Sequence, residues 1–84
     1  HQQTEQLQMV LTRANLTIMG GTTLFQTIQT SRAYHLHDHL AKAAIWTRKF
    51  SQMTDLLRFG IPANAVDFAR LSESLHNWRQ ETNQ

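Results

Sequence analysis

The chain has 84 residues, with eight Lys and Arg against six Asp and Glu, which gives a formal net charge of +2. This length accommodates one small domain and excludes a catalytic domain with a separate substrate lobe. The absence of cysteine excludes a disulfide framework and a thiolate metal site, and the small charge excess is a weak indication of nucleic-acid binding.

The first part of the chain has the apolar spacing of an amphipathic helix. Apolar residues from Leu7 to Ile18 recur at intervals of three and four, so they share one helical face. Gly20 and Gly21 follow, and glycine readily adopts the left-handed conformation that ends helices. We therefore predict a helix over residues 4–19.

The middle part of the chain predicts one long helix over residues 23–59. It opens with a capping box at residues 23–26 and ends before Gly60. Between these signals, side chains repeat with the seven-residue spacing of a helical contact seam. The seam residues are Leu36, His39, Ala43, Trp46, Phe50, Met53 and Leu57. The polar interval at residues 29–32, near Thr30, allows a break into two helices.

The last part of the chain predicts a third helix over residues 62–80. Apolar residues again recur at helical spacing, up to Trp78. The start of this helix is marked either by Pro62 in the first turn or by Asn64 as the N-cap, with Asp67 three residues on. The sequence does not decide between these two starts.

Together these elements predict a single all-α domain over residues 1–84. The architecture is a three-helix bundle or helical hairpin, with four helices if the middle helix breaks near Thr30. At about 1.5 Å per residue, an unbroken middle helix is about 54 Å long. The other two predicted helices are too short to cover this length. We therefore expect dimerisation to complete the bundle, through a seam whose parallel or antiparallel arrangement stays open.

A histidine cluster, His35, His37 and His39, has metal-ligand chemistry. On a helix, His35 and His39 stand one turn apart and could together bind zinc, copper or nickel. This set needs a further ligand, so the alternative is that His39 lies at the seam and the other two histidines face solvent. Histidine titrates at about pH 6.5, and a charged His39 would no longer pack in the seam. The cluster could therefore also act as a pH sensor that loosens the seam in acid.

Catalysis and nucleic-acid binding have less support in the sequence. It shows no glycine-rich phosphate loop, paired carboxylates or elbow-type serine, so we expect no catalytic residue, cofactor or small-molecule substrate. Residues 53–79 could form the helix-turn-helix of a small dimeric DNA-binding regulator, with Lys42, Arg48 and Lys49 as its basic patch. Asp67 would then face phosphate, so this function is the alternative and not the main hypothesis.

The main hypothesis is a non-enzymatic protein–protein interaction module of the adaptor, regulator or co-chaperone type. Its helix seam would pack against a protein partner or a second copy of the chain, with Phe59 and Trp78 at the periphery of the interface. No apolar run approaches the roughly 18 residues that cross a bilayer, and no secretory signal pattern is present. We therefore expect a soluble, cytoplasmic protein with no membrane contact.

Overall fold

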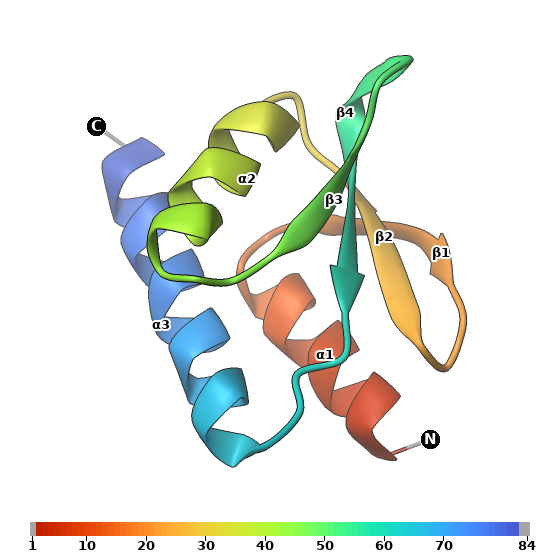
Figure 1. Cartoon of the computed structure of the whole chain (residues 1–84), viewed down its shortest axis with the longest axis vertical. Helices are drawn as coiled ribbons and strands as arrows, with labels where there is room; N and C mark the ends of the chain where they lie inside the picture. The colour runs from red at the N-terminus through yellow and green to blue at the C-terminus, as the bar shows by residue number, and fades with distance from the viewer. Residues whose placement is uncertain (1, 83–84) are drawn as a thin grey trace.

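The computed structural model describes residues 2–82, which form three helices and a four-stranded antiparallel sheet (Figure 1). The strands are ordered β1-β2-β4-β3 across the sheet. The fold is therefore α+β, and the prediction of an all-α bundle is wrong. In chain order the elements are α1 (Gln2–Arg13), β1 (Thr17–Gly21), β2 (Phe25–Gln29), α2 (Ala33–Lys42), β3 (Thr47–Phe50), β4 (Met53–Gly60) and α3 (Ala65–Thr82).

The predicted long helix over residues 23–59 is replaced by β2, α2, β3 and β4. The molecule is 32 Å in its longest dimension, which a helix of about 54 Å would exceed. The residues of β4 show why a strand forms: Leu57 and Phe59 are buried, and Arg58 between them is only half-buried. This alternation is typical of a strand with one covered face. The seven-residue spacing of apolar residues over the same segment favoured a helix instead.

Helix α1 ends at Arg13, earlier than the glycine pair predicted. Asn15 adopts the left-handed conformation, with φ of 65°. The Leu16 N–H donates to the Leu11 carbonyl at 3.1 Å, and the Asn15 N–H donates to the Thr12 carbonyl at 2.9 Å. These two bonds form a Schellman motif, in which asparagine is the usual substitute for glycine.

Helix α2 ends with the same motif, built without glycine or asparagine. Ala44 has a φ of 61°, in the left-handed region. Its N–H donates to the Ala41 carbonyl at 3.0 Å, and the Ile45 N–H donates to the Leu40 carbonyl at 2.9 Å. Alanine gives no sequence signal for this conformation, so the end of α2 could not be predicted.

Helix α3 begins at Ala65, because Asn64 caps it: the Asp67 N–H donates to the Asn64 side-chain oxygen at 2.9 Å. The structure thus selects Asn64 over Pro62 as the start signal. The apolar face predicted for this helix is confirmed, since Phe68, Leu71, Leu75 and Trp78 are all buried. None of the helices described is long and apolar enough to cross a membrane.

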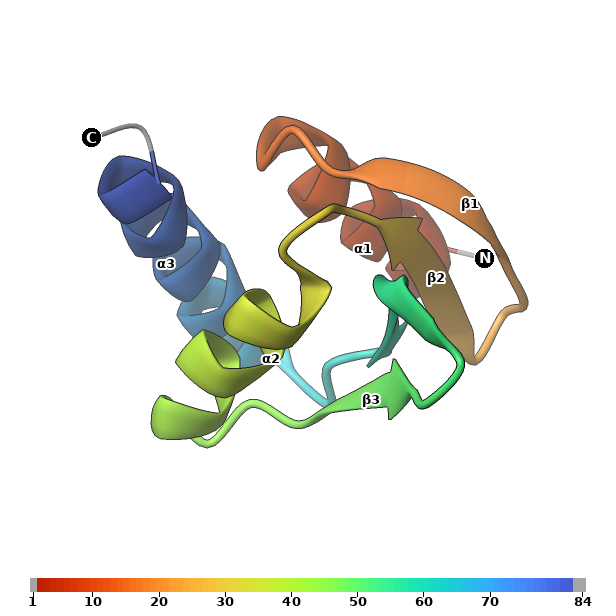
Figure 2. The same cartoon turned by 90° about the horizontal axis from the view of Figure 1, so that it is seen from above.

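The helices gather on one face of the sheet (Figure 2). Gln26, Phe59 and Thr47 are register partners on β2, β4 and β3, so their side chains point to the same side. On that side Gln26 accepts a hydrogen bond from Gln8 of α1 at 3.3 Å, and Thr47 bonds His37 of α2 at 2.7 Å. Helix α3 packs along α2, and the core lies between the helices and this face. The opposite face of the sheet carries none of the helices in residues 2–82.

Candidate functional site

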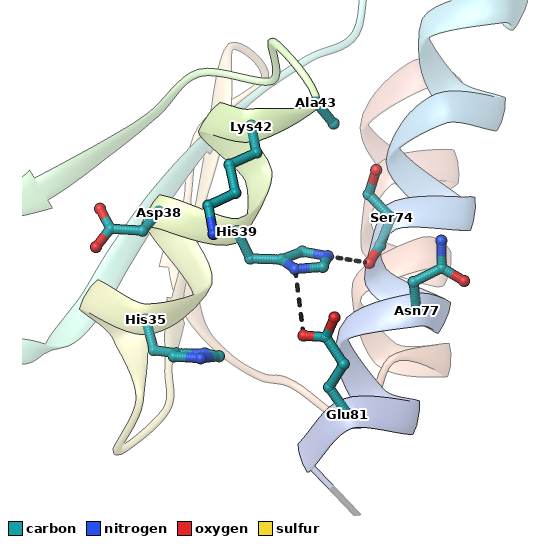
Figure 3. A pocket seen from close by; sticks show the side chains of 8 residues that line it. All are labelled: His35, Asp38, His39, Lys42, Ala43, Ser74, Asn77 and Glu81. Carbon is teal, nitrogen blue, oxygen red and sulfur yellow. Dashed lines mark hydrogen bonds and ion pairs between the residues drawn. The ribbon is translucent and has the colours of Figure 1, made fainter.

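A polar pocket of about 450 Å³ lies between α2 and α3 (Figure 3). It contains His35 and His39, the two histidines predicted as metal ligands, and both lie on the side of α2 that faces α3. The spacing argument for this shared side is therefore correct. The pocket is lined by His35, Asp38, His39, Lys42, Ala43, Ser74, Asn77 and Glu81.

His39 links the two helices of this pocket. Its Nε2 lies 2.9 Å from the Ser74 carbonyl oxygen, and because a carbonyl only accepts, this nitrogen carries the proton and donates. Its Nδ1 lies 3.6 Å from a carboxylate oxygen of Glu81, whose side chain is 62% exposed. This contact is an ion pair only when Nδ1 also carries a proton, and Glu81 is exposed to water, so the bond to Ser74 is the firmer link.

His35 and His37 are occupied by other contacts. The Trp78 indole N–H donates to Nδ1 of His35 at 2.9 Å, and this contact brings α3 onto α2. His37 turns the other way, with its Nδ1 2.7 Å from the hydroxyl of Thr47 on β3. Within the described part of the chain, no group of three or more His, Asp or Glu residues is placed to hold a metal ion. These contacts make the three histidines a clamp between α2 and its neighbours α3 and β3.

The seven predicted seam residues are distributed over four segments, because the helix that would align them does not form. Trp46 is 73% exposed. Phe59 and Trp78, expected at the periphery of an interface, are 1% and 5% exposed and lie in the core. Phe59 faces inward by strand alternation, and Trp78 is turned inward toward His35. Of the seam residues, α2 holds Leu36 and His39, the loop before β3 holds Ala43 and Trp46, β3 holds Phe50, and β4 holds Met53 and Leu57.

The predicted basic patch is divided among different surfaces. Lys42 lines the pocket between α2 and α3. Arg48 and Lys49 are neighbours on β3 and so point to opposite faces of the sheet, and the Lys49 ammonium lies 5.0 Å from the centre of the Tyr34 ring on the helix side. Residues 53–79 hold a strand and one helix, so a helix-turn-helix is not formed there.

A second candidate site lies on the open face of the sheet. Thr27, Arg58 and Arg48 are register partners on β2, β4 and β3, so their side chains share this face. The Arg58 guanidinium stands 4.6 Å above the centre of the Phe25 ring, a cation–π contact that orients it. A hollow of about 400 Å³ adjoins the two arginines, and we call the arginines and this hollow the arginine face. The hollow is lined by Leu24, Phe25, Trp46, Thr47, Arg48, Arg58 and Gly60.

The electrostatics of the arginine face favour an anionic ligand. Arg48 and Arg58 stand directly opposite each other on adjacent strands, an arrangement of like charges that destabilises a sheet. The lining of the hollow includes no Asp or Glu. Within residues 2–82, neither arginine forms an ion pair. Two uncompensated guanidinium groups side by side can together bind a carboxylate or a phosphate.

The sequence did not predict this site, because the two arginines are brought together only by the register of β3 against β4. Arg48 was assigned to a helical basic patch, and Arg58 lay within the long helix predicted over residues 23–59. Only the pairing of β3 with β4 brings these residues, ten positions apart in the chain, into opposition. The available signal was the alternation of Leu57, Arg58 and Phe59, which identifies Arg58 as the outward residue of a strand.

Comparison with known proteins relates the chain to part of an enzyme. No family model matches it. Two curated relatives are both named threonine-phosphate decarboxylase. The chain is 37% identical over 76 residues to the one from Pseudomonas aeruginosa (strain PAO1), and 38% identical over 69 residues to the one from Sinorhizobium sp.. The matches cover 90% and 82% of this chain, but only 23% and 21% of the relatives.

This similarity corrects the functional hypothesis. The relatives are named as enzymes, so the expectation of a non-enzymatic adaptor, regulator or co-chaperone is wrong. The expectation rested on the absence of a complete catalytic motif from these 84 residues. A chain that spans less than a quarter of the relatives need supply only part of a site, and part of a site has no recognisable motif.

Proposed function

We propose that the chain is part of a threonine-phosphate decarboxylase and that its arginine face binds an anionic group of the substrate. Similarity to two enzymes of that name supports the reaction. The observation that carries the site is the opposed pair Arg48 and Arg58 on the open face of the sheet, beside a hollow whose lining includes no carboxylate. This proposal replaces the expectation that the chain has no small-molecule substrate.

Threonine phosphate has the chemistry that two guanidinium groups recognise. It carries a carboxylate and a phosphate ester, and a planar guanidinium can donate two parallel hydrogen bonds to either group. Arg58 is held over the Phe25 ring, so it loses less side-chain freedom when it binds an anion. Arg48 is exposed and can adjust its position to the ligand.

The role of such a site in decarboxylation is positioning. The reaction breaks the bond between Cα and the carboxylate carbon, releases carbon dioxide and places a proton from solvent on Cα, while the phosphate ester stays intact. A substrate anchored by its anionic groups presents that bond in one orientation to the remaining catalytic groups, and orientation alone lowers reaction barriers substantially. The arginine face thus supplies binding and alignment, and the other parts of the enzyme supply the chemistry.

The test is the kinetics of arginine variants made in the whole polypeptide, with release of carbon dioxide from threonine phosphate as the measured reaction. We expect Arg58→Gln to lower kcat/KM about 30- to 100-fold, because one charge-assisted interaction with the substrate is lost. Arg48→Gln should lower it about 10-fold, since Arg48 is more exposed to water.

Lys49→Gln is the matched control. It removes the same unit charge from the next residue of β3, on the face that packs against α2. Its kcat/KM should stay within about twofold of the original enzyme. Wild-type kcat/KM in both arginine variants, or an equal loss in Lys49→Gln, would refute the assignment of the arginine face.

Self-association or binding of another protein, metal binding by His35 and His39, and a cytoplasmic location stay predictions from the sequence. The DNA-binding alternative loses its structural basis, because residues 53–79 form a strand and one helix in place of a helix-turn-helix.

A further inference from the structure

Two large apolar side chains stand out of the molecule at the edge of the arginine face. Leu24 is 75% exposed and Trp46 is 73% exposed, and both line its hollow. We call these two residues the apolar rim. Large apolar side chains exposed around one hollow are typical of a surface that another protein segment covers.

The main-chain structure around Trp46 holds this side chain outward. Just before it, Ala44 and Ile45 close the end of α2 with hydrogen bonds to Ala41 and Leu40. Directly after it, β3 begins at Thr47. Trp46 is thus set between two fixed elements. It also lines a second, smaller hollow of about 270 Å³ whose other walls are largely apolar, so the uncovered apolar surface extends beyond the arginine face.

We propose that, in a polypeptide of the length of the relatives, the apolar rim docks against residues of the same polypeptide outside the matched region. This contact covers the open side of the hollow beside Arg48 and Arg58. The matched residues make up less than a quarter of each relative, so more than three quarters of each relative lies outside the match. A covalently linked segment is present at high effective concentration and needs little affinity to cover the rim.

This inference rests on the proposed function, which supplies a second reason for such a contact. The hollow beside the arginines is open on the side away from the sheet, and a substrate there would be surrounded by water on that side. Excluding water strengthens the interaction between guanidinium groups and an anion. The docking segment should therefore present apolar side chains to Leu24 and Trp46, and no carboxylate to Arg58.

The experiment measures the reactivity of single cysteines in the whole polypeptide, with maleimide as the probe and peptide mass spectrometry as the readout. Residues 1–84 contain no cysteine, so each introduced thiol in this region is unambiguous. Leu24→Cys reports on the rim, and Met9→Cys on α1, 52% exposed, is the matched control. Both are substitutions at exposed positions, so the fold should tolerate them.

We expect Leu24→Cys to react at least tenfold more slowly in the native protein than in urea, and Met9→Cys to react within about threefold of its urea rate. Native Leu24→Cys that reacts as fast as Met9→Cys would overturn the proposal. Protection of Leu24→Cys that disappears on dilution would also overturn it, because a second copy of the chain would then be the occupant.

The labelling does not require catalysis, so the two proposals fail separately. Loss of protection in an enzyme that decarboxylates threonine phosphate would refute the docking alone. Protection in a protein with no activity toward threonine phosphate would refute the substrate alone and support the docking.

Discussion

Ala44 lies in the left-handed conformation, with φ of 61°, at the end of α2. An L-residue with a Cβ pays roughly 1–2 kcal/mol for this conformation, and glycine does not. The motif is nevertheless formed, because two hydrogen bonds and the start of β3 fix the chain on both sides. The position of Trp46 on the arginine face therefore depends on a locally unfavourable residue.

This strain yields a prediction about stability. Ala44→Gly should raise the free energy of unfolding by about 1 kcal/mol, because the side chain is exposed and its removal loses no core contact. Urea denaturation measures the change. Ala43→Gly is the control, since Ala43 has a φ of −96° and gains nothing from glycine; it should lower stability by about 0.5–1 kcal/mol. A destabilised Ala44→Gly variant would show that the conformation is not strained.

At the scale of elements, the sequence predicts well where local signals act and fails where distant segments pair. The apolar face of α3 was predicted and Asn64 was one of its two candidate start signals, because both features depend on residues within one or two turns. The strands were not, because β2 and β4 are stabilised by pairing between residues that lie far apart in the chain. The contact of α3 with α2 through Trp78 and His35 could likewise not be predicted, since 43 positions separate the two residues in the sequence.

That contact predicts a difference between the two tryptophans. Trp78→Phe should lower the free energy of unfolding by about 1–2 kcal/mol, because it removes the indole donor to His35 and part of a ring that is 5% exposed. Trp46→Phe should change it by less than about 0.5 kcal/mol, since Trp46 is 73% exposed. Urea denaturation of both variants makes the comparison. Equal effects would contradict the different placements of these side chains.

In the whole molecule, the two faces of the sheet carry different kinds of residue. The helix side holds the core and the histidine clamp, which together account for the apolar spacing and the histidine cluster seen in the sequence. The open side holds Arg48, Arg58, Leu24 and Trp46, none of which belongs to the core of residues 2–82. Residues that cost stability or solubility without contributing to the core are the expected mark of a functional surface.

We propose that one substrate molecule lies across Arg48 and Arg58, and a double-mutant cycle in the whole polypeptide is the sharpest test. The measurement is kcat/KM for threonine phosphate in Arg48→Gln, Arg58→Gln and the double variant. Two residues that share one ligand are coupled, so the double variant should lose less than the product of the two single losses, by at least about threefold. Strictly multiplicative losses, or single variants that retain the original kcat/KM, would contradict a shared anion at this pair.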